Sequence, residues 1–187
     1  MDNLFFDRSQ LKHCGKNVII GKTVRIRHPE KVSVGDNVII DDFCYIAGMV
    51  EIGDYVHIAN GCTLSAGPRS IHMGPFSGLS AGCRVYAGSS NYLSCGLDMP
   101  TIPREYVYNV VAEEVVLSRF VIIGANSIIL PGVNIPEGMA FAANLVIRKK
   151  QGLQSWTIML DQEGTTRPRK GVQQMLDKVK EFYTFKD

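Results

Sequence analysis

Aliphatic residues recur at every sixth position over most of this 187-residue chain. The spacing is interrupted three times and restarts each time. The four runs consist of Cys14, Ile20, Ile26; Val34, Ile40, Ile46, Ile52, Ile58, Leu64; Met73, Leu79, Val85; and Leu117, Ile123, Ile129, Ile135, Phe141, Ile147. Glycine often follows the aliphatic residue, and a small or medium apolar residue often lies four positions after it. A spacing of six fits neither an amphipathic α-helix nor a β-strand with one polar face.

A repeat of six residues predicts a parallel β-helix, in which each hexad supplies one short strand and a tight turn. Three hexads form one coil of a triangular prism, with the aliphatic residues on its axis. Grouped in this way, the hexads predict about six coils over residues 14–150. Residues 1–13 are expected to cap the open end of the first coil, because solenoids need capped ends. Chance clustering of aliphatic residues would not resume after each interruption.

The interruptions predict where the prism carries its loops. Two, three and about 26 extra residues separate the runs, and each insertion follows the third hexad of a coil. All three insertions therefore leave the prism at one vertex. The longest, about residues 92–116, contains Pro100, Pro103 and the pair Glu113–Glu114. A loop this long in a compact repeat is commonly functional, and it is expected to line a site, cover the prism or pack on a neighbouring subunit.

After Lys150 the repeat is expected to end, and residues 151–187 to form a connector and a C-terminal helix. The connector, residues 151–168, is polar except for an apolar patch at 156–160. Apolar residues at spacings of three and four then predict an amphipathic helix over residues 169–184. Its apolar stripe consists of Val172, Met175, Leu176, Val179 and Phe182. The helix is expected to pack on the prism or on another subunit.

Composition excludes several functional classes. The net charge of +2 gives no basic tract for nucleic acid. The chain shows no signal-peptide pattern and no apolar run near the roughly 20 residues that span a bilayer. We therefore expect a cytoplasmic protein without membrane insertion. Cys44, Cys62 and Cys83 take the same place in successive coils, which favours an internal column of small packed side chains over a disulfide or metal site. Cys95 lies in the long loop and is the cysteine expected to be reactive.

The repeat resembles the hexapeptide-repeat acyltransferases over about residues 14–150, especially in the stretch VIIGANSIILPGVNIPEGMAFAANLVIRK. This resemblance implies a left-handed parallel β-helix. Three further stretches are similar to sugar acetyltransferases of surface-polysaccharide and O-antigen synthesis, namely YVHIANGCTLSAG (55–67), YAGSSNYLSCGLDMPTIP (86–103) and SWTIMLDQ (155–162). The family implies acetyl-CoA as donor, no metal cofactor, a homotrimer and an active site between subunits. The acceptor would be a nucleotide-linked amino sugar or a glycan precursor.

Two histidines are candidates for the general base of such a reaction. His57 matches the histidine of the similar 55–67 stretch, and it is expected to point outward at a corner of the prism and to meet a neighbour's long loop. Its alternative role is a solvated corner residue. His72 lies in the three-residue insertion at the loop vertex and is the second candidate. Many relatives carry a histidine where this chain has residues 88–91, so N-acetylation, which needs less help from a base, is as open as O-acetylation.

The long loop and the last coils carry the candidate binding residues. Asn91 and Ser90 could hold the thioester oxygen or sugar hydroxyls, although this stretch also favours a polar turn. Asp98 and Glu105 are candidates for contacting an amino sugar. The resemblance places the pantetheine arm of CoA in a groove lined by small residues, here Gly124, Ala125, Ala142 and Ala143. Arg148 and Lys149, with Lys150 beyond them, would meet phosphates or form a solvated basic end.

The leading hypothesis is an acetyl-CoA-dependent sugar acetyltransferase. A non-catalytic β-helix scaffold that has lost activity is the first alternative. A metalloenzyme like the γ-class carbonic anhydrases is the second, and it would need three histidine ligands converging at a subunit interface.

Overall fold

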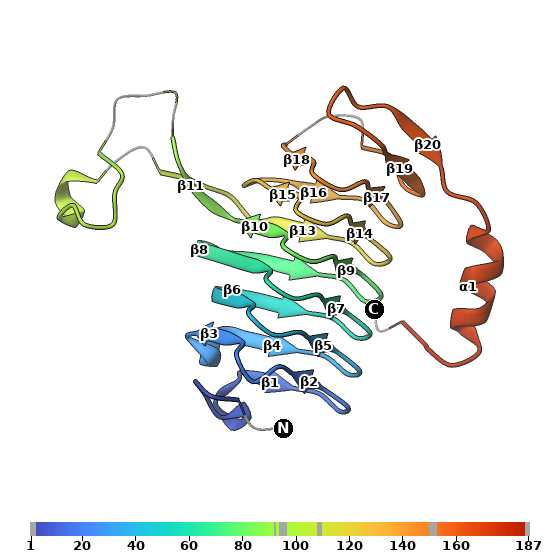
Figure 1. Ribbon diagram of the computed structural model, residues 1–187, viewed down its shortest axis with the longest axis horizontal. Helices are drawn as coiled ribbons and strands as arrows, with labels where there is room; N and C mark the ends of the chain where they lie inside the picture. The colour runs from blue at the N-terminus through green and yellow to red at the C-terminus, as the bar shows by residue number, and fades with distance from the viewer. Residues whose placement is uncertain (1–2, 92, 94–96, 108–109, 150–152, 186–187) are drawn as a thin grey trace.

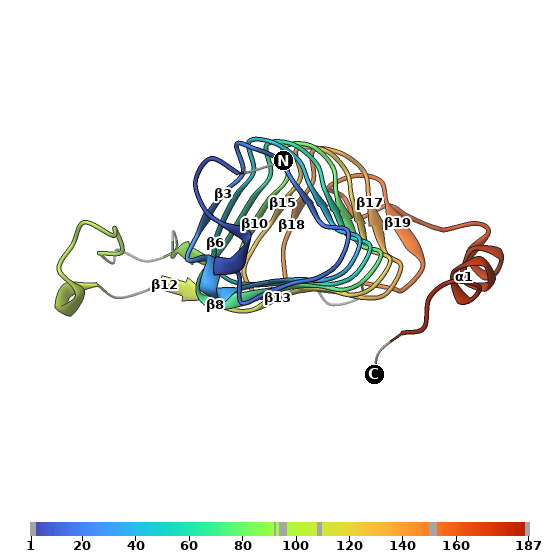
Figure 2. The ribbon, with the colours of Figure 1, turned by 90° about the horizontal axis from the view of Figure 1, so that it is seen from below.

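The chain winds into a three-sided prism whose coils stack along one axis, seen from the side in Figure 1 and along the stack in Figure 2. This computed structural model describes residues 3–91, 93, 97–107, 110–149 and 153–185. Successive coils pair through parallel strands, so that Ile20 lies beside Ile40 and Ile40 beside Ile58. The predicted parallel β-helix is confirmed, and the arrangement agrees with the left-handed form that the resemblance implies.

One face of the prism is a separate sheet, which we call the β2–β19 face. Its parallel strands, in order, are β2 (Ile19–Ile20), β5 (Ile39–Ile40), β7 (His57–Ile58), β9 (Gly78–Leu79), β14 (Ile122–Ile123), β17 (Ala140–Phe141) and β19 (Thr157–Met159). The strand β20 (Thr166–Pro168) closes its edge in antiparallel pairing. In each two-residue strand the second residue is buried, and the first is at least partly exposed in every strand except β17, where Ala140 is buried as well.

The other two faces form one continuous sheet, because β6 and β8 run around the vertex between them. Its strands are β1 (His13–Cys14), β3 (Arg25–Arg27), β4 (Val32–Val34), β6 (Tyr45–Ile52), β8 (Thr63–Met73), β10 (Arg84–Tyr86), β13 (Val115–Leu117), β15 (Ile128–Ile129), β16 (Asn134–Ile135) and β18 (Val146–Ile147). Short 3-10 helices are η1 (Arg8–Gln10), η2 (Pro29–Lys31) and η3 (Arg104–Tyr106).

The aliphatic residues of the hexads fill the axis of the prism, as predicted. Ile20, Ile40, Ile58 and Ile123 are at most 1% exposed, and burial of each such side chain stabilises the fold by about 1.5–3 kcal/mol. The predicted cysteine column is confirmed as packed and free of disulfides. Its thiols donate to backbone oxygens, with Cys44 and Cys62 each lying 3.2 Å from their acceptors. Cys95 lies outside the described residues.

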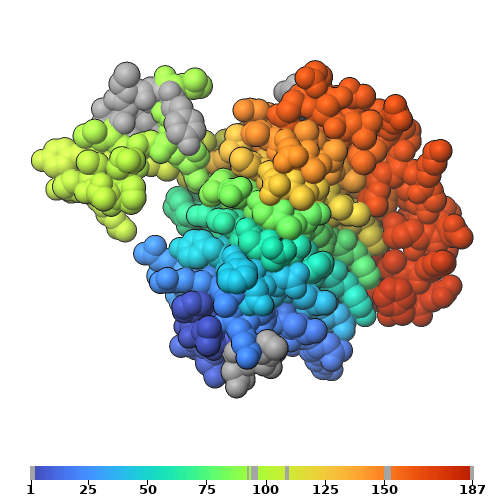
Figure 3. All heavy atoms as spheres, viewed as in Figure 1, coloured from blue at the N-terminus to red at the C-terminus, as the bar shows by residue number. Residues whose placement is uncertain are grey.

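The insertions leave the prism at one vertex, as predicted. The first contains η2, the second lies within β8, and the third follows β10. The third forms an antiparallel hairpin of β11 (Gly88–Ser90) and β12 (Val110–Ala112), whose connection carries η3. This hairpin with its connection, residues 88–112, is called the arm below. It projects beyond the prism (Figures 1 and 3).

A column of aromatic rings runs along the vertex that separates the first and second strands of the coils. Tyr55, Phe76, Phe120 and Trp156 occupy equivalent turn positions with positive φ. Adjacent ring centroids lie 4.9 Å apart from Tyr55 to Phe76 and 5.1 Å apart from Phe76 to Phe120. Trp156 reaches Phe120 at 5.6 Å across Gly138, where an added Cβ would lie 2.2 Å from the indole ring. We call these four rings the aromatic column.

The repeat extends further than predicted. Leu153 and Met159 continue the spacing of six directly from Ile147, and β19 pairs in parallel with β17. The expected end of the repeat at Lys150 is therefore wrong, and part of the connector forms a seventh coil. Lys150 itself lies outside the described residues. This last coil was not predicted because the sequence around residues 149–151 is polar.

The C-terminal helix α1 (Val172–Lys180) is shorter than the predicted 169–184. It begins after Gly171, whose φ of 71° is incompatible with a helical turn. Beyond Lys180 the chain turns back to the prism, and Tyr183 and Phe185 pack edge-on against Phe76 at 4.9 and 6.0 Å. The tyrosine hydroxyl also donates to Asp54 at 2.8 Å. The segment thus packs on its own prism, one of the two expected arrangements.

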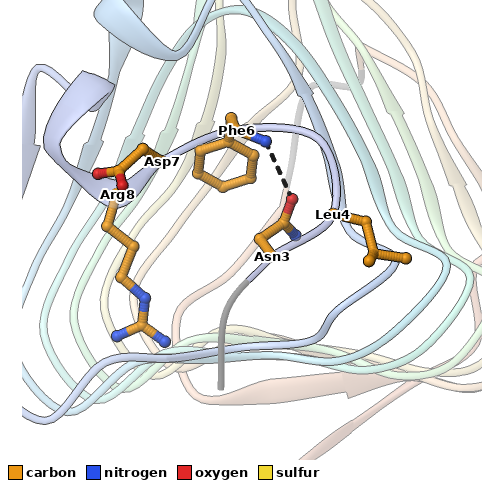
Figure 4. A pocket seen from close by; sticks show the side chains of 5 residues that line it. All are labelled: Asn3, Leu4, Phe6, Asp7 and Arg8. Atoms are coloured by element: carbon orange, nitrogen blue, oxygen red, sulfur yellow. Dashed lines mark hydrogen bonds between the residues drawn. The ribbon is translucent and has the colours of Figure 1, made fainter.

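The N-terminal residues cover the open end of the first coil. Asn3 donates to the backbone oxygens of Gly21 and Val24, and Arg8 donates to that of Val18. Between them lies a hollow of about 540 Å³, seen in Figure 4, which is lined by Asn3, Leu4, Phe6, Asp7 and Arg8. These contacts serve the cap, and the hollow gathers no catalytic side chains.

Candidate active site

His57 lies on the outward side of β7, in the middle of the β2–β19 face. It was expected at a corner, and this expectation is wrong, because its hexad position falls within the strand. Its Nε2 lies 2.8 Å from Oδ2 of Asp41, which follows β5 in the coil below. Both side chains are accessible, at 57% and 43% exposure. The sequence reading missed Asp41, although pairing of residues 39 and 57 one coil apart would have indicated its proximity.

The Asp41–His57 pair can act as an oriented base. If the carboxylate accepts the Nε2 proton, Nδ1 of the neutral ring remains an acceptor for a substrate proton. A shallow hollow of about 290 Å³ lies beside the ring, and its other lining residues are Ala59, Gly78, Leu79, Ser80, Ala81 and Ile122. Small side chains at 59, 78 and 81 leave room for a reacting group next to the imidazole.

His72 lies on another face, on the outward side of β8. Its Nδ1 is 3.0 Å from Oε2 of Glu51, and its Nε2 is 2.9 Å from Oε1 of Glu114. A neutral imidazole has only one N–H, so the ring satisfies both carboxylates only as a doubly donating cation. Such a ring has no lone pair with which to accept a proton. The structure therefore separates His57 and His72 and leaves His57 as the better placed base.

The arm carries the other candidates. Ser90 ends β11 opposite Val110, and Asn91 follows it. The Asn91 side chain accepts a hydrogen bond from the backbone of Leu93 at 3.1 Å, the local turn that the sequence also favours. Asp98 and Glu105 lie farther along the arm, with Glu105 exposed in η3. Since the arm leaves a different vertex, none of these residues belongs to the surroundings of His57 in the same chain.

The last coils hold the predicted CoA residues. Gly124 is small for a different reason than expected, because an added Cβ would lie 2.5 Å from the Ala142 carbonyl carbon in the next coil. Arg148 and Lys149 are exposed, and Lys149 forms an ion pair with Glu113 at 2.7 Å. They edge a hollow of about 290 Å³ whose other lining residues are Val146, Ile147, Leu153, Met159 and Gln162. We call it the last-coil hollow; it has an apolar floor and a cationic rim.

A further hollow of about 280 Å³, the loop-vertex hollow, was not predicted. It lies at the vertex from which the arm leaves, and it is lined by Arg27, His28, Lys31, Tyr45, Ala47, Gly48, Ser65 and Gly67. Arg27 and Lys31 bring two cations to its rim, and Tyr45 supplies a ring. A signal was present in the sequence, because Arg25, Arg27, His28 and Lys31 cluster around the two-residue insertion.

Two structural findings bear on the alternatives. Within the described residues, no three His, Cys, Asp or Glu side chains are grouped so that they could hold a metal ion. In the same part of the chain, no helix has the length and apolar character needed to cross a membrane.

Comparison with known proteins identifies the family. The family described as bacterial transferase hexapeptide (six repeats) matches residues 31–66. A dTDP-4-amino-4,6-dideoxy-D-glucose acyltransferase from Escherichia coli is 30% identical over 161 residues, which cover 84% of this chain and 82% of that protein. This chain belongs to the hexapeptide-repeat acyltransferases. The resemblance seen in the sequence is thereby confirmed, and the protein is an acyltransferase.

Solved structures of acyltransferases agree with this assignment. AntD, an N-acyltransferase from Bacillus cereus in complex with dTDP and 3-hydroxybutyryl-CoA, has a TM-score of 0.84 and 37% identity, and the match covers 96% of both chains. A single-residue variant of AntD in complex with dTDP-4-amino-4,6-dideoxyglucose and coenzyme A has a TM-score of 0.83 and 36% identity, covering 97% of this chain and 100% of that one. A maltose O-acetyltransferase from Clostridium difficile, at 16% identity and a TM-score of 0.53, shares the fold alone.

Proposed function

We propose that this acyltransferase moves an acyl group from acyl-CoA to the amino group of a nucleotide-linked amino sugar. The observation that carries this proposal is the presence of two separate hollows with two cationic side chains on each rim. Both substrates of such a reaction carry phosphates, and cationic side chains bind phosphates through charge-assisted hydrogen bonds. The ligands named for the AntD structures, a nucleotide or nucleotide sugar together with CoA, support the same pairing of substrates.

The acceptor is assigned to the loop-vertex hollow. Arg27 and Lys31 would bind the diphosphate, and the Tyr45 ring offers an apolar surface for the base. The arm leaves the same vertex, so we propose that Ser90 and Asn91 at its base bind the sugar, with Asp98 and Glu105 further out. Two of the four proposed arm residues are carboxylates, which suit an amino group.

The donor is assigned to the last-coil hollow. Arg148 and Lys149 would bind CoA phosphates, while Leu153 and Met159 supply an apolar floor. Ala125, Ala142 and Ala143 lie on neighbouring turns and leave space for the pantetheine arm. Acetyl-CoA is the proposed donor, and 3-hydroxybutyryl-CoA, bound in one AntD structure, is the donor to be compared with it. No metal is needed for this chemistry.

In the proposed reaction the neutral amine attacks the thioester carbonyl. The new C–N bond forms first and gives a tetrahedral oxyanion, and the nitrogen gives its proton to His57. The C–S bond then breaks, and the His57 imidazolium protonates the leaving CoA thiolate. Asp41 orients the imidazole and stabilises the cation that forms. Asn91 is proposed to donate its side-chain N–H to the developing oxyanion. An amine that is already neutral needs less help from a base than a hydroxyl, which favours N-acylation.

The site would be complete only in an assembly, proposed to be a homotrimer with closed symmetry. The β2–β19 face leaves Ile19, Ile39 and Ile122 exposed on either side of His57. On the arm, Leu93 is 97% exposed and Met99 is 60% exposed. Packing of one chain's arm against its neighbour's β2–β19 face would bury both apolar surfaces and bring arm residues to His57. The proposed setting is the cytoplasm, in the synthesis of a surface polysaccharide.

The first test is ligand-induced stabilisation. The melting temperature is measured with acetyl-CoA, 3-hydroxybutyryl-CoA, CoA, dTDP and a metal chelator. A ligand present at a hundred times its dissociation constant stabilises the folded state by about 2.7 kcal/mol, so the three CoA ligands and dTDP should each raise the melting temperature. If neither class of ligand does so, the scaffold alternative gains support, and a fall with chelator alone would support the metalloenzyme.

Turnover of a dTDP-linked amino sugar then tests the assigned residues. His57→Ala and Asp41→Asn should lower kcat, the former by about 10²–10⁴-fold as for loss of a general base. Lys31→Ala should raise the KM for the acceptor and leave that for CoA unchanged, while Lys149→Ala should do the opposite. Equal effects of the two lysine variants on both substrates would contradict the assignment of the hollows.

A further inference from the structure

His72 is the centre of a row of charged groups that crosses three elements. Strand register places Glu51 of β6 directly beside His72 of β8, and Val116 of β13 on its other side. Glu114 lies two residues before Val116, and it accepts hydrogen bonds from His72 at 2.9 Å and from Ser70 at 2.6 Å. Glu51 in turn meets Lys12 at 3.5 Å. The row therefore reads Lys12, Glu51, His72, Glu114, with basic side chains and carboxylates alternating.

Glu114 stands where the arm rejoins the prism. The returning strand β12 ends at Ala112, and β13 begins at Val115. Several contacts fix this junction: the Glu113 N–H donates to the Ala87 oxygen at 3.0 Å, Arg69 donates to the Ala112 oxygen at 3.1 Å, Lys149 pairs with Glu113, and Ser70 and His72 both contact Glu114. Since Ser90 pairs with Val110, a shift of the returning strand would move the base of the arm.

We propose that His72 is a positioning residue, which in its protonated state clips the returning strand of the arm to the prism through Glu51 and Glu114. This role rests on the proposed function only in so far as the arm carries the acceptor site. Loss of one proton would leave a ring lone pair facing a carboxylate, so one of the two contacts would become repulsive. The junction would then keep the contacts of Arg69, Ser70 and Lys149 and the backbone hydrogen bond from Glu113 to Ala87, but it would lose one of the two contacts of His72.

Other charged groups near the ring do not replace this contact. Ser70 already donates to Glu114, and together with nearby His72 it holds the pKa of that carboxyl below its usual value. Lys12 faces the far oxygen of Glu51. His13 lies in the same row on β1, separated from Glu51 by Ser33, and forms no contact with the clip. His13→Gln is therefore a matched control for His72→Gln.

The clip and a general base predict opposite dependence on pH. If His72 were the base, activity would rise as it lost its proton, and His72→Gln would lower kcat by about 10²–10⁴-fold. If His72 is the clip, the acceptor KM, measured from about pH 5 to pH 8, rises once the ring has lost its proton. His72→Gln should then raise this KM by about two- to fivefold, the size of effect that exposed ion pairs give, and abolish its pH dependence while leaving kcat almost unchanged.

His72→Arg sharpens this test, because a guanidinium keeps its charge and can donate to both carboxylates. It should preserve the low acceptor KM at the alkaline end of the range, where the wild-type value rises. His13→Gln should follow the wild type throughout. A fall in kcat without a change in KM, or a pH profile of His72→Gln that matches the wild type, would overturn the proposal.

Two measurements are independent of turnover and thus of the proposed function. Histidine NMR of the folded protein, assigned with the Gln variants, should show both ring nitrogens of His72 protonated at the acid end of the range. Hydrogen exchange of the β11 and β12 amides, corrected for the intrinsic pH dependence, should increase when His72 loses its proton. A ring carrying one proton throughout, or exchange that is equal in wild type and His72→Gln at every pH, would contradict the clip even in an inactive protein.

Discussion

The arm and the C-terminal segment, residues 171–185, are both additions to the repeat, yet they contact different surfaces. The C-terminal segment returns to its own prism, where Val179 is buried and Tyr183 packs on Phe76. The arm leaves the opposite side of the molecule in Figure 1 and exposes large apolar side chains, including Leu93, Leu97 and Met99. The first addition therefore has its partner within the chain, whereas the second presents apolar surface that this chain does not cover.

This difference separates stability from function. Aromatic contacts of the kind made by Tyr183 and Phe185 contribute about 0.5–1.5 kcal/mol each beyond burial, so the C-terminal segment should stabilise the prism. An exposed arm stabilises its own prism very little, and its side chains are available to a substrate or a second copy. Mutations in the arm should therefore lower activity and hardly change stability, whereas mutations in the C-terminal segment should lower stability and hardly change activity.

The largest expected effect comes from removing the outer arm. Replacement of residues 93–107 by a short glycine–serine link should lower turnover by at least about 10²-fold, the effect of small misplacements in a site. The melting temperature of the prism should hardly change. Truncation after Lys180 provides the matched comparison, since it should lower the melting temperature and leave turnover of the folded fraction intact. An arm deletion that unfolds the protein would contradict the proposed difference between the arm and the C-terminal segment.

The next effect concerns Phe120 in the aromatic column. Phe120→Ala removes a ring that is 5% exposed, which should cost about 3–5 kcal/mol of stability. Its φ of 62° is unfavourable for any side chain, and Phe120→Gly should recover about 1 kcal/mol of that loss. Denaturant titration of the three proteins measures both values. If Phe120→Gly proves less stable than Phe120→Ala, the aromatic column does not hold the backbone of residue 120 at positive φ.

The smallest effect is that of one hydroxyl in the C-terminal segment. Tyr183→Phe removes the hydrogen bond to Asp54 and should cost about 0.5–1.5 kcal/mol. Burial, with the Asp54 contact, raises the pKa of Tyr183 to about 12. A pKa raised in the folded state means that this stabilisation is complete below about pH 10 and is lost as the pH rises to about 12. The difference in the free energy of unfolding between wild type and Tyr183→Phe should shrink over that interval. A difference that does not change with pH would show that this hydroxyl does not contribute to the stability of the fold in the way proposed.

Most of the fold could be predicted from the spacing of the aliphatic residues, because each side of every coil places one such residue on the prism axis. Leu153 and Met159 continue the same spacing but lie among polar residues, so the seventh coil was not predicted. The aromatic column was also written in the sequence, since Tyr55, Phe76 and Phe120 follow their aliphatic residues by the same three positions. What the spacing does not encode is the return of residues 182–185 to that column, which follows the turn beyond Lys180.

The candidate site was less accessible to sequence reasoning. The sequence made His57 the first candidate and His72 the second, but their partners decide their chemistry, and those partners lie 16 to 42 residues away in sequence. Asp41 was missed because stacking of coils, and not local pattern, brings it to His57. Arg27 and Lys31 cluster in the sequence, but stacking of coils is what places Tyr45 and Ser65 beside them in one hollow. Asp98 and Glu105 stay predictions, as do the roles of Ser90 and Asn91, because their surroundings depend on where the arm packs.

The return of the C-terminal segment to the aromatic column changes how the prism should come apart. A solenoid behaves approximately as a chain of nearest neighbours, in which one coil can open without disturbing distant ones. Here a single segment touches Asp54 of the third coil, Phe76 of the fourth and Phe120 of the fifth, and it is continuous with Trp156 of the seventh. These coils are thereby joined into one cooperative unit, while the first two, which the segment does not touch within the described residues, are left to fray on their own.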